Sequence, residues 1–197
     1  VLSYVPVYHY SSSHLIMSIT TNPQIPCPQS ILDSLEEVLV TYKDFSGAQK
    51  TSTIEVHASL ASDVRDFFKR AFTLGFSFTD IVRASDAPYH FDDLLLMQAN
   101  ASSGFNYRLI AGMQTPSLHG LGRAIDINPR LNPYIRYVND VTVNILPHNS
   151  SYDPLANGTL TAQHPLVVFM KSRGWEWGGD WTKESGRIDR HHFQKAE

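Results

Sequence analysis

The chain has 197 residues, enough for one domain with a substantial core. A hydrophobic content of 42% argues against a disordered chain, and a net charge of −3 without a Lys/Arg run argues against a nucleic-acid surface. No apolar run reaches the roughly 18 residues of a membrane span, and a single cysteine, Cys27, excludes a disulfide framework and a thiolate metal site.

Residues 1–49 are expected to form an N-terminal wrapping segment that ends in the first strand. Its first part, residues 1–29, contains several prolines and a serine run and is expected to be irregular, with at most one strand. Ser30 followed by Asp33 predicts a short capped helix. The β-branched stretch 38–45 then predicts a strand.

Residues 50–197 are expected to form the core of the same globular domain. Alternation around residues 54–56 predicts a second strand, and apolar residues at helical spacing predict a helix over 60–74 that Gly75 ends. Further strands are predicted at 105–110, 123–128 and 189–193, with a loop-rich excursion between the last two. A helix is predicted over 165–173, opened by Pro165.

This order of elements predicts an α+β fold. We expect a single domain with a mainly antiparallel sheet and helices packed on one side.

Two clusters carry the residues with chemical potential, Ser117–Asp126 in the middle of the chain and Asp189–Phe193 near its end. They supply two imidazoles (His119 and His192), one carboxylate ligand (Asp126) and a spare carboxylate (Asp189). Three such ligands leave one coordination position open, as in catalytic zinc sites, and the spare carboxylate suits a general base. The spacing alone also allows a hydrogen-bonded loop pair, His119 with Asp126, and surface histidines near the end.

These clusters resemble the zinc D-alanyl-D-alanine carboxypeptidases of the VanY and VanX type, a family whose relatives include phage L-alanyl-D-glutamate endolysins. The resemblance rests on Ser117-x-His119-x-x-Gly122-x-Ala124-x-Asp126 and Asp189-x-x-His192-Phe193. It extends to the stretches 105–108, 126–129, 132–134 and 174–181 and covers roughly residues 50–195, in order.

The resemblance implies a small α+β fold shared with the hedgehog signalling domain. It implies one Zn²⁺ ion held by His119, Asp126 and His192, and hydrolysis of peptidoglycan stem peptides, foremost as a D-alanyl-D-alanine carboxypeptidase. It also implies a secreted or cell-envelope location. We further expect a monomer, with no nucleic-acid partner and no membrane span.

The resemblance also implies roles for residues around the metal. Asp189 would move the proton and Arg108 would stabilise the oxyanion, with a salt bridge to Asp92 or Asp93 as the structural alternative for Arg108. Ser117 would orient a ligand or touch substrate, or simply cap a turn. Trp177, with Trp181, would line the substrate groove, or pack in the core.

Two departures leave alternatives open. The carboxypeptidases have Glu at the position of Asp189, and an aspartate is similar to the endolysin branch, so a wall endopeptidase remains an alternative. His191 precedes His192, and because adjacent strand residues point to opposite faces, only one should bind metal; the position before Phe193 favours His192.

A binding module that keeps zinc without catalysis is the rival from another class, and the pair Asp189 and Arg108 argues against it.

Overall fold

The computed structural model describes residues 25–110 and 113–196, and its first large element is a long β-hairpin. Strand β1 (Leu35–Lys43) pairs along its whole length with the antiparallel strand β2 (Gln49–His57), with Leu35 opposite His57 and Lys43 opposite Gln49. The two strands predicted from the sequence are therefore confirmed, although both are longer than expected. The proposed boundary at residue 49/50 falls at the start of β2, and the division there stays a prediction.

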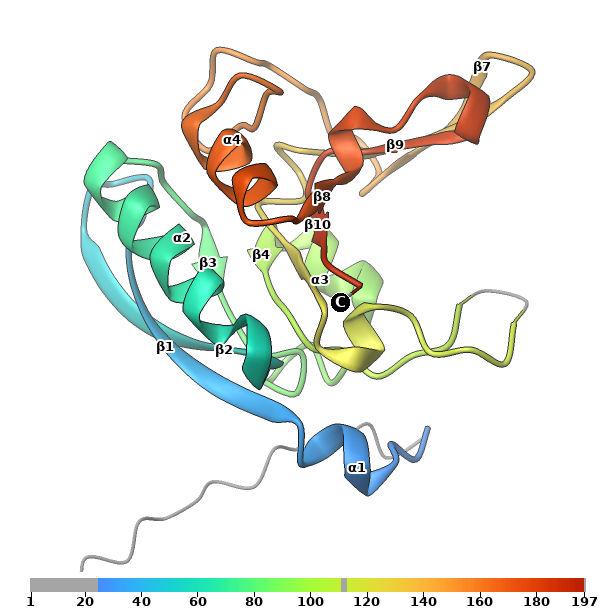
Figure 1. The fold of residues 1–197 in the computed structure, drawn as a ribbon. Coiled ribbons are helices and arrows are strands. Elements are labelled where there is room, and N and C mark those ends of the chain that lie inside the picture. The colour runs from blue at the N-terminus through green and yellow to red at the C-terminus, as the bar shows by residue number, and fades with distance from the viewer. Residues whose placement is uncertain (1–24, 111–112, 197) are drawn as a thin grey trace, which may run out of the picture.

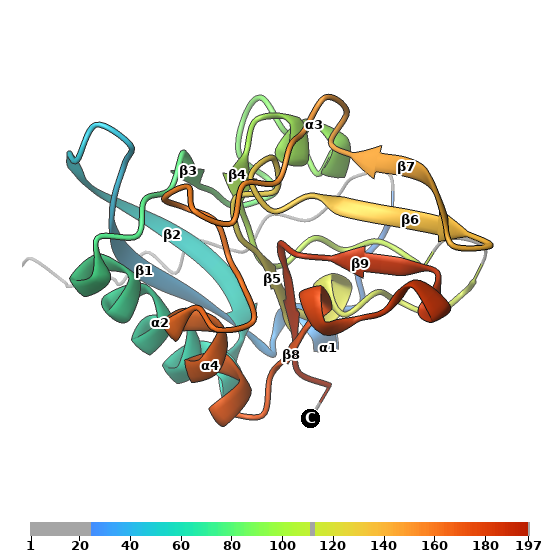
Figure 2. The same ribbon diagram turned by 90° about the horizontal axis from the view of Figure 1, so that it is seen from above.

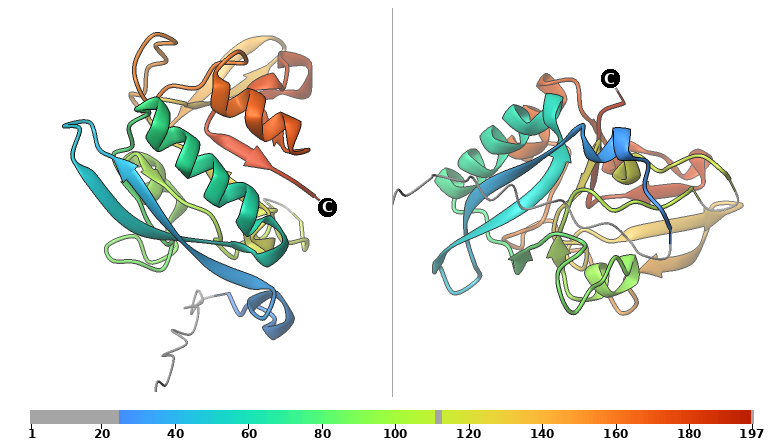
Figure 3. Two further views of the ribbon diagram at one scale, coloured as in Figure 1. Left: turned by 60° about the vertical axis from the view of Figure 1, so that its left-hand side comes forward. Right: turned by 90° about the horizontal axis from the view of Figure 1, so that it is seen from below.

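Helix α2 (Ala61–Leu74) covers one face of this hairpin, and α4 (Pro165–Ser172) lies beside it (Figures 1 and 3). The buried face of α2 follows the predicted helical spacing, and Gly75 ends the helix in the left-handed conformation. Leu74, which the pattern assigned to the buried face, is 52% exposed. The side chains of the two helices and the hairpin form the main hydrophobic core.

Three further small sheets complete the fold (Figure 2). One has the order β5-β10-β8, formed by Ala124–Asp126, His192–Gln194 and Glu176–Trp177. A second has the order β7-β6-β9, formed by Val141–Leu146, Tyr134–Val138 and Arg187–Asp189. The third pairs β3 (Asp80–Ile81) with β4 (Ala101–Ser102) in parallel. The α+β class is confirmed, but several small, mostly antiparallel sheets replace the predicted single one.

Short helices connect these units. They are α1 (Gln29–Leu32), α3 (Asp93–Gln98) and the 3-10 turns η1 (Ala58–Leu60), η2 (His119–Leu121), η3 (Gly178–Asp180) and η4 (Lys183–Ser185). Ser30, predicted as a cap, lies inside α1, whose N-cap is Pro28. Among the described residues, no helix combines the length and apolar character that crossing a membrane requires.

Three predictions about the second half of the chain were wrong. Residues 105–110 form no regular strand, because their backbone groups bond to separate neighbours, such as Phe105 N–H to the carbonyl of Glu55. The excursion contains the β6–β7 hairpin, which turns at Asn139 and Asp140, both with positive φ, as a tight primed turn requires. The final strand is split into β9 and β10, which belong to different sheets.

The predicted irregular segment 1–29 falls mostly outside the described residues. The helix predicted over 165–173 is confirmed as α4, with Pro165 in its first turn and Gly174 in the left-handed conformation just after its end.

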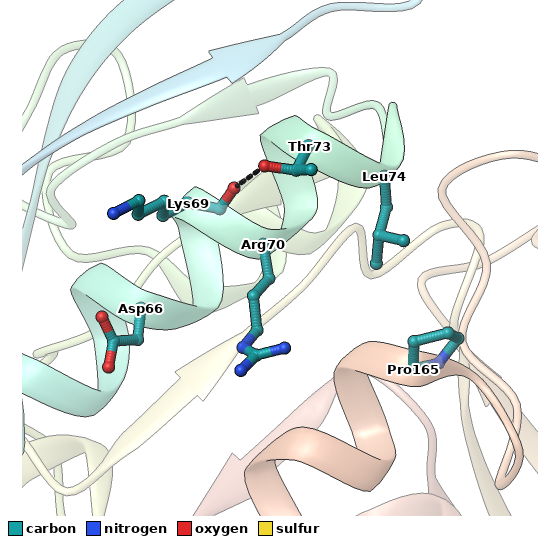
Figure 4. Close-up of a pocket in the computed structure, with 6 residues that line it drawn as sticks. All are labelled: Asp66, Lys69, Arg70, Thr73, Leu74 and Pro165. Atoms are coloured by element: carbon teal, nitrogen blue, oxygen red, sulfur yellow. Dashed lines mark hydrogen bonds between the residues drawn. The ribbon is translucent and has the colours of Figure 1, made fainter.

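A pocket of about 380 Å³ lies between α2 and α4 (Figure 4). Its walls carry Asp66, Lys69, Arg70, Thr73, Leu74 and Pro165. None of these residues belongs to the two motif clusters, so the pocket is separate from the candidate site described below.

One buried acid in the hairpin predicts an unusual pH dependence of stability. Glu55 on β2 is 1% exposed, and neither of its carboxylate oxygens has a hydrogen-bond partner among the described residues. Burial raises the pKa of Glu55 to about 7, with Arg83 opposing that rise and Glu37 and Asp86 adding to it. The folded protein therefore holds a proton that the unfolded chain releases near its ordinary pKa of 4.5.

We expect the free energy of unfolding to fall as pH rises from about 4.5 to about 7. In this range the carboxyl of Glu55 is ionised in the unfolded chain but still protonated in the folded protein, so rising pH stabilises the unfolded state alone. Glu55→Gln should remove the contribution of Glu55 to this slope and be more stable than the wild type above pH 7, by up to about 3 kcal/mol. Urea unfolding at pH 5 and pH 8 measures both effects. Glu36→Gln, at a more exposed position of the same hairpin, is the control and should keep the wild-type slope. A wild-type slope in Glu55→Gln would contradict the assignment.

Candidate metal centre

Three side chains from the two motif clusters meet at one point. His119 lies in η2, Asp126 ends β5 and His192 begins β10, where the antiparallel register places it directly opposite Asp126. Directly opposite residues of an antiparallel pair carry their side chains on the same face. The register thus joins two residues that are far apart in the sequence.

The turn that carries His119 is fixed from both ends. Ser117 Oγ accepts a hydrogen bond from the N–H of Gly120 at 3.1 Å, so Ser117 caps the turn, the structural alternative that the sequence left open. Gly122 ends the turn with φ of +66°. A Cβ at Gly122 would lie 2.6 Å from the backbone nitrogen of His57, so only glycine allows the turn to lie against the hairpin.

The three ligand atoms form a nearly regular triangle. His119 Nε2 lies 3.1 Å from His192 Nδ1 and 3.2 Å from Asp126 Oδ1, and His192 Nδ1 lies 3.1 Å from the same oxygen. Ligands of a tetrahedral zinc ion at about 2.0–2.1 Å are separated by about 3.3 Å, close to these edges. All three residues are at most 9% exposed.

Hydrogen bonds behind the triangle orient both imidazoles as metal ligands. His119 Nδ1 lies 2.8 Å from the carbonyl oxygen of Gly104, which can only accept, so Nδ1 carries the proton and Nε2 keeps its lone pair. His192 Nε2 lies 3.0 Å from Gln194 Oε1, and the amide of Gln194 is itself oriented by donating to Glu176. His192 therefore presents the lone pair of Nδ1. Such outer partners are typical of metal-binding histidines.

The convergence of these lone pairs tests whether a metal fits. In the neutral rings, Nε2 of His119 and Nδ1 of His192 both face a carboxylate oxygen that is also an acceptor. Burial by itself would raise the pKa of Asp126, but the neighbouring imidazoles hold it well below its ordinary value, so the carboxylate is ionised. Three acceptors about 3 Å apart repel one another unless a cation lies between them. The donor set therefore fits a divalent ion such as zinc.

His191 is directed at the two acids of the site. Its Nδ1 donates to the carbonyl oxygen of Asn132 at 2.9 Å, and its Nε2 lies 3.0 Å from Asp189 Oδ1 and 3.9 Å from Asp126 Oδ2. Burial would lower the pKa of His191, but Asp189 and Asp126 raise it to about 10. The ring is therefore an imidazolium whose second N–H faces Asp189.

Of the two adjacent histidines, only His192 belongs to the group of possible metal donors, in agreement with the prediction, but His191 faces the site as well. His191 lies in the turn between β9 and β10, where the strand alternation behind that prediction does not apply. His192 joins the metal donors, and His191 contacts the carboxylates of Asp189 and Asp126. In the sequence, the only signal that His191 would contact a carboxylate was Asp189, which lies two residues before it in the same motif.

The remaining predicted residues lie in different surroundings. Asp189 ends β9 with a side chain that is 14% exposed, and the backbone of Gly178 packs against it so closely that a Cβ would lie 2.5 Å from its carbonyl oxygen. Arg108 is 36% exposed, and its guanidinium pairs with Asp93 at 3.3 Å, the salt bridge considered as its alternative role. Its role at an oxyanion stays a prediction.

Trp177 packs in the core, whereas Trp181 lies beside a metal donor. Trp177 is 3% exposed, stacks on Phe193 and donates its indole N–H to the carbonyl of Arg190 at 2.8 Å. The ring of Trp181 lies 5.6 Å from that of His192 and is partly exposed. The role of either tryptophan at a substrate stays a prediction.

Comparison with known proteins agrees with this site. Residues 111–195 match the model of a family described as D-alanyl-D-alanine carboxypeptidase, which confirms the resemblance for that stretch, somewhat less than half of the chain. The matched stretch contains the three metal donors and Asp189 but not Arg108. Neither a curated protein nor a solved structure matches the chain.

Proposed function

We propose that this protein is a zinc-dependent metallopeptidase that hydrolyses peptidoglycan stem peptides as a D-alanyl-D-alanine carboxypeptidase. The observation that carries the proposal is the triangle of His119, Asp126 and His192, with edges of 3.1–3.2 Å and lone pairs directed inward. The family match over residues 111–195 supports the reaction class. Because stem peptides lie outside the cytoplasmic membrane, the proposal places the protein in a secreted or cell-envelope location.

The ion would be held by His119, Asp126 and His192. When bound, it supplies Lewis-acid chemistry, polarising the scissile carbonyl and making water acidic enough to react at neutral pH. Among the residues that the structure describes, three side chains form the donor group, so the site fits the open coordination of catalytic rather than structural zinc.

The chain's own residues divide the remaining work. Asp189, three residues before His192, is the general base: it takes the proton from the attacking water and passes it to the amine that leaves. His191 holds that carboxylate in place from 3.0 Å, and the carbonyl of Asn132 in turn holds His191. Arg108 donates to the developing oxyanion, a role that requires its guanidinium to divide its hydrogen bonds between the substrate and Asp93.

Release of D-alanine from a stem pentapeptide tests the proposal. The protein loaded with one equivalent of zinc should release D-alanine, dialysis against a chelator should abolish release, and added zinc should restore it. Mass spectrometry of the products identifies the bond that is cut. Intact pentapeptide in the presence of zinc would contradict the proposed reaction, and cleavage between L-alanine and D-glutamate would identify the endopeptidase alternative instead.

A further inference from the structure

Two arginines lie side by side on the sheet that carries Asp189. The antiparallel register of β6 and β9 places Arg136 directly opposite Arg187, and Tyr134 directly opposite Asp189. Directly opposite residues share a face of the sheet, as do residues two apart along one strand. Arg136, Arg187 and Asp189 therefore share one face of this sheet, whose strands are seen in Figure 2.

Trp181 connects this face to the metal centre. The guanidinium of Arg187 lies 4.6 Å from the centre of the Trp181 ring, and that ring lies 5.6 Å from the ring of His192. A cation over an aromatic face is held in position while its N–H groups stay available. Arg187 is thus held on a tryptophan ring that itself lies near a metal donor, and it shares a strand with the base Asp189.

The pairing of two cations is unfavourable unless an anion joins them. Both arginines are exposed, and within residues 25–110 and 113–196 neither has an acidic partner at ion-pair distance. Like charges directly opposite each other on a sheet are destabilising. The nearest acid on this face, Asp189, is already in contact with Nε2 of His191 at 3.0 Å.

We propose that Arg187 and Arg136 form a carboxylate-binding subsite that takes the free C-terminal carboxylate of the peptide substrate. This inference rests on the proposed peptidase function and names the feature of the substrate that is recognised. Arg fits a carboxylate with two parallel hydrogen bonds, and two arginines at directly opposite positions of the sheet suit one anion.

The spacing along β9 agrees with such a substrate. In a C-terminal residue, the nitrogen of the scissile bond is about 2.5 Å from the carboxylate carbon. A base that protonates this nitrogen and a cation that binds the carboxylate must therefore be near neighbours. Asp189 and Arg187 are two residues apart on one strand, about 6.6 Å between Cα atoms, and the long Arg side chain covers that separation. An internal bond would present an uncharged amide at the same place.

The experiment compares an N-acetylated stem pentapeptide ending in D-alanyl-D-alanine with the same peptide as a C-terminal carboxamide. The zinc-loaded wild type should have a kcat/KM about ten- to a hundredfold higher for the free acid, the range expected for a hydrogen-bonded ion pair. Arg187→Gln should lose most of this preference by slowing hydrolysis of the acid alone, and Arg136→Gln should lose part of it. Arg187→Lys should keep only part, because Lys retains the charge but not the two parallel hydrogen bonds. Lys69→Gln, an exposed cation on α2 at the remote pocket (Figure 4), is the charge-matched control and should change nothing.

Calorimetric binding of both peptides to the zinc-loaded Asp189→Asn protein, with and without Arg187→Gln, separates this inference from the proposed function. An Arg187-dependent preference for the acid supports the subsite even if the wild type cleaves neither peptide, in which case only the proposed function fails. Equal binding and cleavage of acid and amide would overturn the subsite, since the amide keeps the internal carboxylates of the stem. The subsite would also be overturned if Arg187→Gln weakened binding of the acid and of the amide equally, or if neither peptide bound.

Discussion

Replacing Asp189 with asparagine should lower kcat by about a hundred- to ten-thousandfold, the usual contribution of a general base. Asparagine keeps the size of the side chain and its place at the end of β9 but cannot accept the proton of the attacking water. Because Asp189 is not among the three metal donors, the zinc content should stay at one equivalent. Hydrolysis of a stem pentapeptide and elemental analysis of the same sample measure the two quantities.

Asp180→Asn is the matched control for this substitution. Asp180 is an exposed carboxylate in η3 that pairs with Lys171, and its replacement should leave kcat and zinc content unchanged. If Asp189→Asn retained more than a tenth of the wild-type kcat, another group would have to be the base. If it lost zinc as well, Asp189 would instead be part of the metal site.

Replacing His119 with alanine should weaken zinc binding by more than about a hundredfold, because loss of an outer partner alone costs ten- to a hundredfold and a direct ligand contributes more. The variant should lose its zinc on dialysis and with it all hydrolysis. Metal content is measured by elemental analysis, and circular dichroism before and after zinc addition reports whether the fold persists.

His148→Ala serves as the comparison for the histidine substitution. His148 is exposed and lies outside the donor group, so its replacement should leave the zinc affinity at the wild-type value. A second variant, Gln194→Leu, removes the hydrogen-bond partner of His192 Nε2 without touching a donor. We expect an affinity loss smaller than that of His119→Ala. Full zinc content in His119→Ala would contradict the assigned ligand.

Most of the predictions that depend on local pattern agree with the structure. The spacing of Val64, Phe67 and Phe68 gave the buried face of α2, and Gly75 and Pro165 marked helix ends. Each of these signals acts within a few residues, since helix periodicity and terminal conformation depend on neighbouring backbone. The β6–β7 hairpin also had a local signal, Asn139-Asp140, which was missed among the other loop residues around it.

The predictions that failed depend on partners far away in the chain. Residues 105–110 contain aromatic and aliphatic side chains typical of a strand, but their backbone N–H groups bond one at a time to separate segments: β2, η2 and the loop at Thr115. The stretch 187–194 crosses from the sheet of β6 to the sheet of β5, and the turn this requires places His191 against Asp189. Strand propensity reports how a segment fits a pleated surface and does not specify which surface is present.

The sequence by itself determined which chemical groups the site contains: two imidazoles and a carboxylate as ligands, with a second carboxylate three residues before the last imidazole. It could do so because donor type and short spacing are properties of the chain alone. Only the tertiary structure decided how these groups are directed, since the register of β5 with β10 joins Asp126 to His192 and the carbonyl of Gly104 sets the tautomer of His119. Hydrogen bonds between distant segments orient lone pairs, and no pattern of neighbouring residues encodes them.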